Sequence, residues 1–461
     1  MVFDEEKYAE FIKMEITQKN LDFYEEKYLS NNLKFNSIEL EFEFLYSLSK
    51  HFIDFFSMET NRIQNALFLK KDEFYKPIFY TLKAIDVLNS NVLNCPIDEY
   101  IKRAYVNLGN YFANQYRIYE ALECYNKALH FDLYFDMANA NRLLAFEKIE
   151  CLNYYVDNQK LFYYLANEYS ILDTKNMEAG NEFFSLKKIH YMKALKARIN
   201  KFKNGKSKNP LQQFTILIDC ELSDTYNEWC LKNGLYLNPL NDIELAVEAA
   251  NDIFVDAGLD LDNKKMSLLK RLFNDYIYCR EKVYAKKSVS SDNEIRELCS
   301  TFKELFSIFD KIAYFLFLFF DLDFKDKDVT YLRVFDLNTK LKNGTYLLDI
   351  HNTNLYSLFW IKREYRMSND KLNMHQYLNK ETKYLNDIRT KLEHRTSLLE
   401  KEEIDVLFDK TVGLLKIVRR ALLYLNALVY EESNPALYSN GKRNTNLVYL
   451  PLVNGENLFK E

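Results

Sequence analysis

Hydrophobic residues in this chain recur mostly every three or four positions, which is the spacing of one face of an α-helix. In the N-terminal part, Leu40, Phe44, Leu45, Leu48 and Phe52 share such a face. In the second half the pattern is longer and predicts helices at about 240–256, 263–286, 291–321, 353–366, 375–398 and 402–431. Two short apolar stretches, 328–335 and 448–453, are candidates for short strands.

Composition strengthens the helical interpretation. The 461 residues include only 9 Gly and 6 Pro, too few for the many turns of a sheet protein. The 35 Phe and 35 Tyr provide large rings that fill helix–helix contacts. The length allows two to four domains with ample buried core. We therefore expect an all-α protein.

One segment carries a repeat pattern. Seven positions match a tetratricopeptide unit of about 34 residues at every spacing: Tyr105, Leu108, Gly109, Phe112, Ala121, Tyr125 and Ala128. A weaker unit follows near 136–172. Since one repeat cannot bury its own face, we expect a helical array over roughly residues 20–200. It would either present a concave surface to a protein or peptide partner, or simply pack against the second domain.

The basic, polar stretch Lys201–Pro210 contains both Gly and Pro and is the best domain boundary. We expect four parts: a tetratricopeptide-like helical repeat domain (1–200), a linker (201–212), a second helical domain (213–432) and a polar, Asn-rich C-terminal tail (433–461).

Charge and cysteine usage limit the partners and the compartment. A net charge of −5 argues against a general nucleic-acid coat, so any RNA contact must be local. The seven cysteines form no C-x-x-C pair and are typical of free thiols in a reducing cytoplasm. The run Ile312–Phe320 is too short to span a bilayer. We expect a soluble cytoplasmic protein without a membrane partner, metal or other cofactor.

The clearest chemical signal is a pair, Arg389 and His394, with four residues between them in a helical stretch. Histidine titrates near neutrality and can move protons. Arginine keeps its charge and can clamp phosphate oxygens with parallel hydrogen bonds. Five helical positions place the two roughly 140° apart. A shared site therefore requires either that the long arginine side chain curls round the helix or that a second chain supplies the facing half.

Four stretches together resemble the HEPN superfamily, and within it a bacterial subfamily that follows a tetratricopeptide-like N-terminal region. They cover about residues 213–400 and are 226–231 with 237–242, 276–280, 306–320 and 388–395. The resemblance implies a helical bundle that pairs with a second copy, so that one RNA cleft receives the Arg and the His of both protomers. It further implies a metal-independent endoribonuclease acting as a toxin or as an effector that shuts down infected bacterial cells.

In that interpretation Arg389 binds the phosphoryl oxygens and His394 moves protons while the ribose 2′-hydroxyl attacks the adjacent phosphate. Six residues are candidates for support or RNA contact, and a solvated or structural role is the alternative for them: Thr390, Glu393, Arg395, Lys391, Asp310 and Lys311. Thr390 departs from the resemblance, because active members commonly carry Asn, Asp or His after the Arg. The alternative is an inactive adaptor that dimerises and binds a partner protein through its repeats.

Overall fold

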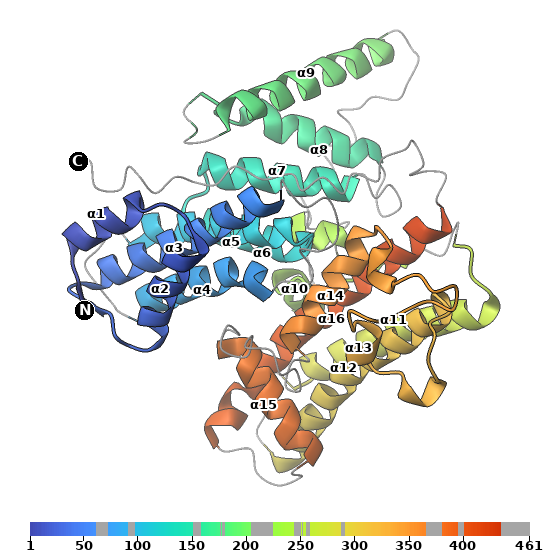
Figure 1. Ribbon diagram of the computed structural model, residues 1–461. Coiled ribbons are helices and arrows are strands. Elements are labelled where there is room, and N and C mark those ends of the chain that lie inside the picture. Colours follow the sequence, from blue (N-terminus) through green and yellow to red (C-terminus); the bar gives the residue numbers. More distant parts are fainter. Residues whose placement is uncertain are drawn as a thin grey trace. The chain divides into compact units, whose positions relative to one another are not determined.

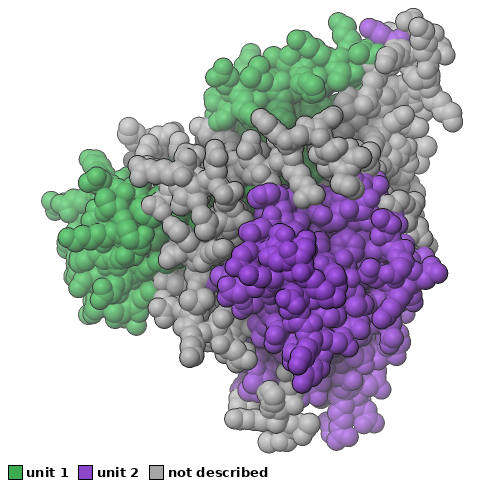
Figure 2. Space-filling model, turned by 45° about the vertical axis from the view of Figure 1, so that its right-hand side comes forward, with its two compact units in different colours: residues 1–148, 165–197, 447–461 green, residues 149–164, 198–446 purple. Residues whose placement is uncertain are grey.

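A computed structural model of the chain describes residues 1–60, 72–90, 97–150, 158–175, 177, 180–203, 225–243, 250, 252–254, 259–286, 291–365, 380–394 and 401–434 (Figure 1). Nearly all of the regular structure in these ranges is helical, so the predicted all-α fold is confirmed. The chain divides into two compact units (Figure 2). Unit 1 comprises residues 1–148, 165–197 and 447–461, and unit 2 comprises residues 149–164 and 198–446.

Unit 1 is a series of helices that pack on their neighbours in sequence. α3 packs on α4, α4 on α5, and α5 on α6, an order typical of helical repeats. A small parallel pair, β1 (Val2–Phe3) and β2 (Lys34–Phe35), stands at its N-terminal end. The helices are α1 (Glu5–Lys13), α2 (Gln18–Leu29), α3 (Ile38–Thr60), η2 (Asp72–Tyr75), α4 (Lys76–Asn89), α5 (Ile97–Asn114), α6 (Ile118–Phe131) and α7 (Asp136–Glu150). They are followed by α8 (Asn158–Ile171) and α9 (Asn181–Lys203), whose residues are divided between the two units.

The crossing of α5 and α6 explains the glycine of the repeat pattern. A Cβ atom at Gly109 would lie 2.4 Å from Cε1 of Tyr125. That ring is fully buried, and its hydroxyl donates a hydrogen bond to Oδ1 of Asn110 at 2.8 Å. Only a residue without a side chain therefore leaves room for the ring at this crossing.

Gly109→Ala should lower the free energy of unfolding by about 1–3 kcal/mol, because the tyrosine ring must shift in a packed core. An uncrowded helix would instead gain stability from the same change. Urea unfolding of Gly109→Ala, Tyr125→Leu and the double variant separates the two effects. The cost of the alanine should shrink in the Tyr125→Leu background, and an undiminished cost would contradict a steric origin.

Glu43 on α3 is a buried carboxyl with a shifted titration. It is 1% exposed, and its Oε2 accepts a hydrogen bond from the Tyr8 hydroxyl at 2.9 Å. Burial raises the pKa of Glu43 to about 7, against the lowering influence of the Tyr8 bond and of Arg103. The folded state therefore binds this proton more tightly than the unfolded state. The contribution of the protonated Glu43 to the free energy of unfolding is greatest below pH 4.5, the pKa of this carboxyl in the unfolded chain. It falls as the pH rises to about 7.

Glu43→Gln should remove this dependence, because the amide does not titrate. The stability of the variant relative to wild type should rise by on the order of 3 kcal/mol between pH 4.5 and 7.5. His51 lies on the same helix and has the opposite slope, since burial lowers its pKa to about 4, but it is present in both proteins and cancels. Urea midpoints at several pH values test this. A difference that does not vary with pH would contradict it.

Unit 2 is a bundle in which α11, α12 and α16 contact one another, α14 packs on α16, and α15 packs on α12. α12 begins with a capping box formed by Ser291 and Glu294. The elements are α10 (Thr225–Lys232), η4 (Pro239–Ile243), α11 (Asn263–Tyr284), α12 (Asp292–Phe319), η5 (Asp326–Asp328), α13 (Tyr331–Val334) and η6 (Leu347–Asp349). They end with α14 (Thr353–Tyr365), α15 (Lys380–His394) and α16 (Lys401–Ser433).

Most helices expected in this half occur within a few residues of their predicted bounds, but two predictions fail. Residues 328–335 contain the helix α13 and no strand, because the Thr330 hydroxyl accepts from the Arg333 amide and the Asp310 carboxylate accepts from the Tyr331 amide. The helix expected at 240–256 is also wrong in part, since 239–243 form a 3₁₀ turn and 252–254 are not helical. The strand expected at 448–453 lies outside the described residues.

Residues 201–203 of the expected linker are the end of α9, and its remainder lies outside the described residues. Within the described ranges, no helix combines the length and the apolar character that a membrane span requires.

Candidate functional site

Helix α15 carries the Arg–His pair and docks on α12 through a narrow apolar face. Leu385 and Ile388 are completely buried, and Leu392 is nearly so. Arg389 follows this face, and its guanidinium carbon lies 5.4 Å from the centroid of the Phe306 ring on α12. A guanidinium over an aromatic face is an attractive arrangement that restrains the side chain without removing its charge. Arg389 is therefore positioned by packing and remains partly exposed.

His394 is the last residue of α15, which places both residues of the pair on one helix. The side chains of His394 and Glu393, and the whole of Arg395, lie outside the described residues.

Two candidates next to Arg389 have partners within their own chain. The Thr390 hydroxyl donates to the backbone carbonyl of Asn386, one turn earlier on α15, at 2.9 Å. The Lys391 ammonium forms an ion pair with Glu403 of α16 at 2.5 Å. Both interactions fasten α15 locally, and any contact of these side chains with RNA must compete with them.

Asp310 and Lys311 on α12 also meet neighbouring elements. Asp310 Oδ1 accepts from the backbone amide of Tyr331 at 3.1 Å, at the start of α13. Lys311 Nζ lies 2.6 Å from Asp275 of α11, with its side chain 40% exposed. Asp310 follows Phe306 by four residues, about 6 Å along the helix axis. The carboxylate thus lies one turn from the ring that carries Arg389.

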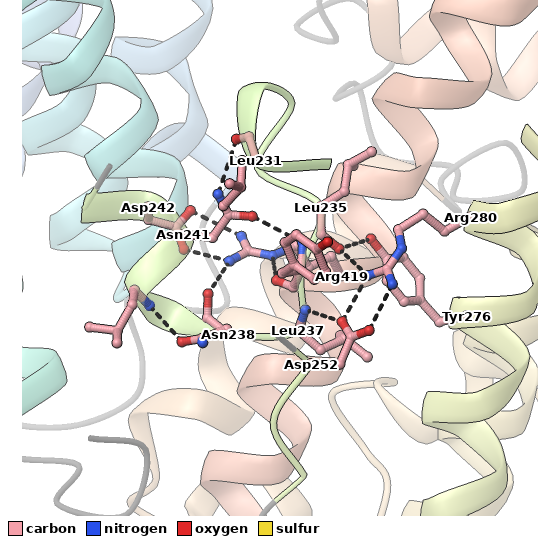
Figure 3. Close-up of polar contacts among 12 residues, drawn as sticks. Leu231, Leu235, Leu237, Asn238, Asn241, Asp242, Asp252, Tyr276, Arg280 and Arg419 are labelled. Atoms are coloured by element: carbon pink, nitrogen blue, oxygen red, sulfur yellow. Dashed lines mark hydrogen bonds and ion pairs between the residues drawn. The ribbon is translucent and has the colours of Figure 1, made fainter. Parts of the chain in front are cut away.

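Sequence reasoning missed the most extensive polar network in the described part of unit 2, which is centred on Arg419 of α16 (Figure 3). Its guanidinium forms a two-pronged ion pair with Asp242, at 3.0 and 2.7 Å. It also donates to the backbone carbonyls of Tyr236 and, at 2.8 Å, Asn238. Arg419 is 1% exposed. One buried cation therefore ties the segment after α10 to a helix nearly 180 residues later.

Arg280 of α11 forms the second half of the same network (Figure 3). It pairs with both oxygens of Asp252 at 2.7 Å and donates to the Leu235 carbonyl at 3.0 Å and to the Tyr226 hydroxyl at 2.9 Å. The Tyr276 hydroxyl donates to the same Leu235 carbonyl at 2.8 Å. Three of the stretches that carry the HEPN resemblance, 226–231, 237–242 and 276–280, thus meet in one network.

Both arginines are saturated by partners and withdrawn from solvent, so the network is a structural clamp and not a phosphate-binding site. Tyr226, Tyr276 and the 237–242 segment were visible in the sequence as parts of the resemblance. No sequence signal pointed to Arg419, because its partners lie far away along the chain.

The described residues give little support for a metal site or for Cys279 as a nucleophile. They contain no group of three or more His, Cys, Asp or Glu side chains placed to hold a metal ion. Burial and the nearby Glu304 raise the pKa of the Cys279 thiol to about 12. Cys279 is therefore protonated at neutral pH and is not a thiolate nucleophile.

Comparison with known proteins agrees with the resemblance over the C-terminal part. Residues 282–432 match the model of the LA2681-like HEPN family. The matched range runs from the end of α11 almost to the end of α16 and includes α15 with its Arg–His pair. No curated protein and no solved structure matches the chain significantly. The match supports HEPN membership for this part of the chain, while a tetratricopeptide-like unit 1 remains a prediction.

Proposed function

We propose that this protein is a metal-independent endoribonuclease that cleaves RNA at a site shared by two copies of the chain. We further propose that it acts as a toxin or effector in bacterial anti-phage defence. The observation that carries the proposal is the position of the pair Arg389 and His394, on one helix inside the stretch that matches a HEPN family.

The proposed reaction is attack of a ribose 2′-hydroxyl on the adjacent phosphorus atom. The attacking hydroxyl gives up a proton, the bond to the 5′-oxygen of the next nucleotide breaks, and that oxygen takes up a proton. His394 moves these protons, which an imidazole can do near neutral pH. Arg389 stabilises the charge on the non-bridging oxygens. The products carry a 2′,3′-cyclic phosphate and a 5′-hydroxyl.

The helical register of α15 favours a shared site. Position 394 lies roughly 200° round the helix from Leu392 of the buried face, whereas Arg389 is about 60° from Leu392. One phosphate is therefore difficult to reach from both positions of one helix. Two copies of α15 facing each other would bring the arginine of one chain to the histidine of its partner.

Within this proposal five of the six supporting candidates divide into two groups. Asp310, Lys311 and Lys391 position the motif helix and its neighbours through the contacts described above. Glu393 and Arg395 flank His394 in sequence, where they would orient the imidazole or guide RNA.

One observation favours a second function, an inactive adaptor that dimerises through its HEPN domain and binds a partner protein through unit 1. The Thr390 hydroxyl is directed to the carbonyl of Asn386 in its own helix. Its one donor hydrogen is therefore already engaged, whereas an Asn or His at this position would have a donor to offer.

The purified full-length protein, incubated with total RNA in excess EDTA, tests the proposal. We expect cleavage in EDTA, with products that end in 2′,3′-cyclic phosphates. Cleavage that requires a divalent metal, or products with 3′-hydroxyl ends, would contradict the mechanism. Failure to cleave any RNA would favour the adaptor.

A further inference from the structure

The connection between α12 and α14, residues 320–352, is long but well organised. It contains the short helix α13 and the 3₁₀ turns η5 and η6. The connection is described throughout and has its own core, with Leu322, Val334, Phe335 and Leu347 completely buried. Two isolated antiparallel bridges, Leu322 with Leu341 and Lys340 with Tyr346, join segments within it. The connection therefore has a defined structure with a packed core.

This connection and α14 line an open, solvent-facing cavity of about 590 Å³. A volume of this size lies within the range of small-molecule sites. The lining combines cations, an aromatic ring, a carboxylate and an amide, and the residues that matter here are Phe324, Arg333, Asp336, Asn338, Lys340 and Lys362. None of them is part of the pair on α15.

Arg333 offers a braced guanidinium surface. Its guanidinium carbon lies 5.2 Å from the centroid of the Phe324 ring, while the side chain as a whole remains 51% exposed. Its nearest carboxylate is that of Asp328, at 3.9 Å. A guanidinium supported on one face by an aromatic ring can stack a nucleobase on its other face.

Two further polar side chains have capacity for a ligand. The Lys340 ammonium lies 4.6 Å from the Tyr346 ring centroid and, among the described residues, pairs with no carboxylate. The Asn338 side chain likewise makes no hydrogen bond within the described part of the chain, although its backbone amide donates to Asp336 Oδ1 at 2.8 Å. An amide and a carboxylate side by side present both donors and acceptors, as the edge of a base requires.

The charged residues that line the cavity favour some anionic ligands over others. Its cations are Arg333, Lys340 and the buried Lys362 of α14, and its carboxylates are Asp323 and Asp336. A net charge of about +1 suits a single phosphate, whereas the carboxylates would repel a di- or triphosphate.

We propose that this cavity binds one nucleotide. The base stacks on the guanidinium of Arg333 and is read by Asp336 and Asn338, and the phosphate faces Lys340 and Lys362. The nucleotide is either a free ribonucleoside monophosphate or one unpaired residue of an RNA strand.

The alternative in which the bound nucleotide belongs to an RNA strand rests on the proposed ribonuclease function. The contacts of α12 support it. Tyr331 lies between the cavity residues Thr330 and Leu332, and its amide is fixed by Asp310 of α12. Phe306, the ring under Arg389, is one turn earlier on the same helix. The cavity wall and the motif arginine are thus attached to adjacent turns of α12, so a strand cleaved at Arg389 would pass near the cavity.

Calorimetric titration of the full-length protein tests the proposal. The probes are the four ribonucleoside 5′-monophosphates, ribose 5-phosphate and a short single-stranded RNA. At least one monophosphate or the RNA should bind, and ribose 5-phosphate should bind at least tenfold more weakly. Arg333→Ala and Asn338→Ala should each weaken binding at least tenfold. Arg296→Ala, an exposed arginine elsewhere on α12, should have no effect.

Asn338 is exposed and its side chain is not part of the packing, so Asn338→Ala keeps the test valid even if Arg333→Ala unfolds. If the RNA competes with the monophosphate for binding, the natural ligand is a nucleotide of an RNA strand. If it does not compete, the natural ligand is the free nucleotide. Absence of binding at millimolar concentration, equal binding of ribose 5-phosphate, or binding unchanged in both variants would overturn the proposal. Binding that persists in Arg389→Ala separates this site from the ribonuclease function.

Discussion

Arg389→Ala and His394→Ala should each reduce the rate of RNA cleavage by at least about a hundredfold. In the proposed mechanism the arginine would provide the fixed positive charge for the phosphoryl oxygens, and removal of one such preorganised group typically costs a factor of about 10²–10³. In the His394→Ala variant, loss of the proposed proton-transfer group should cost a factor of about 10²–10⁴. Arg389→Lys should also be strongly impaired, because an ammonium cannot form two parallel hydrogen bonds.

Stability measurements separate this loss from misfolding. The contact of Arg389 with the Phe306 ring contributes about 0.5–1 kcal/mol, and urea unfolding of Arg389→Ala shows whether the variant is folded. Rates are measured in EDTA with one defined RNA, and Arg296→Ala serves as the matched control for loss of a surface arginine. Variants that cleave at the wild-type rate would remove the pair from the mechanism.

Asp242→Ala should lower the free energy of unfolding of unit 2 by about 3–5 kcal/mol, because it leaves the buried charge of Arg419 without its carboxylate. The guanidinium would keep its backbone partners, Tyr236 and Asn238, but could not return to water without separating α16 from the segment after α10. The loss is much larger than that of a surface ion pair, which is worth about 0–1 kcal/mol.

Lys342→Ala is the matched control, since it removes the ion pair with Asp321, whose side chains are 62% and 71% exposed. Urea unfolding of both variants gives the comparison. Replacing Arg419 and Asp242 together by Met and Leu should recover much of the loss, because no buried charge then remains. An Asp242→Ala protein as stable as Lys342→Ala would contradict the role of the clamp.

The sequence predicted the long helices of unit 2 well, because their apolar faces repeat over many turns. α11, α12 and α16 are examples. The sequence pattern could not predict individual contacts that determine the local structure against the apolar periodicity. The apolar residues of 331–334 look like a strand, yet the hydroxyl of Thr330 and the carboxylate of Asp310, on a different helix, start a helical turn there.

The site shows the same division between local and long-range information. Arg389 and His394 were singled out from their spacing in a helical stretch together with the resemblance of four stretches to the HEPN superfamily, and their role stays a prediction. The contact of Arg389 with Phe306 and the pairing of Arg419 with Asp242 join residues that are distant in sequence, and no local pattern announces such contacts. The cavity of the 320–352 connection was missed for the same reason, since its lining comes from several turns and from α14.

The most direct test of the shared site is complementation between two inactive chains. Arg389→Ala and His394→Ala proteins are produced together with different tags, and the mixed dimers are isolated and assayed for RNA cleavage in EDTA. Each mixed dimer keeps one arginine and one histidine on opposite chains. We predict that it recovers cleavage that neither parent shows. Mixed dimers as inactive as their parents would contradict a site built from two copies of α15.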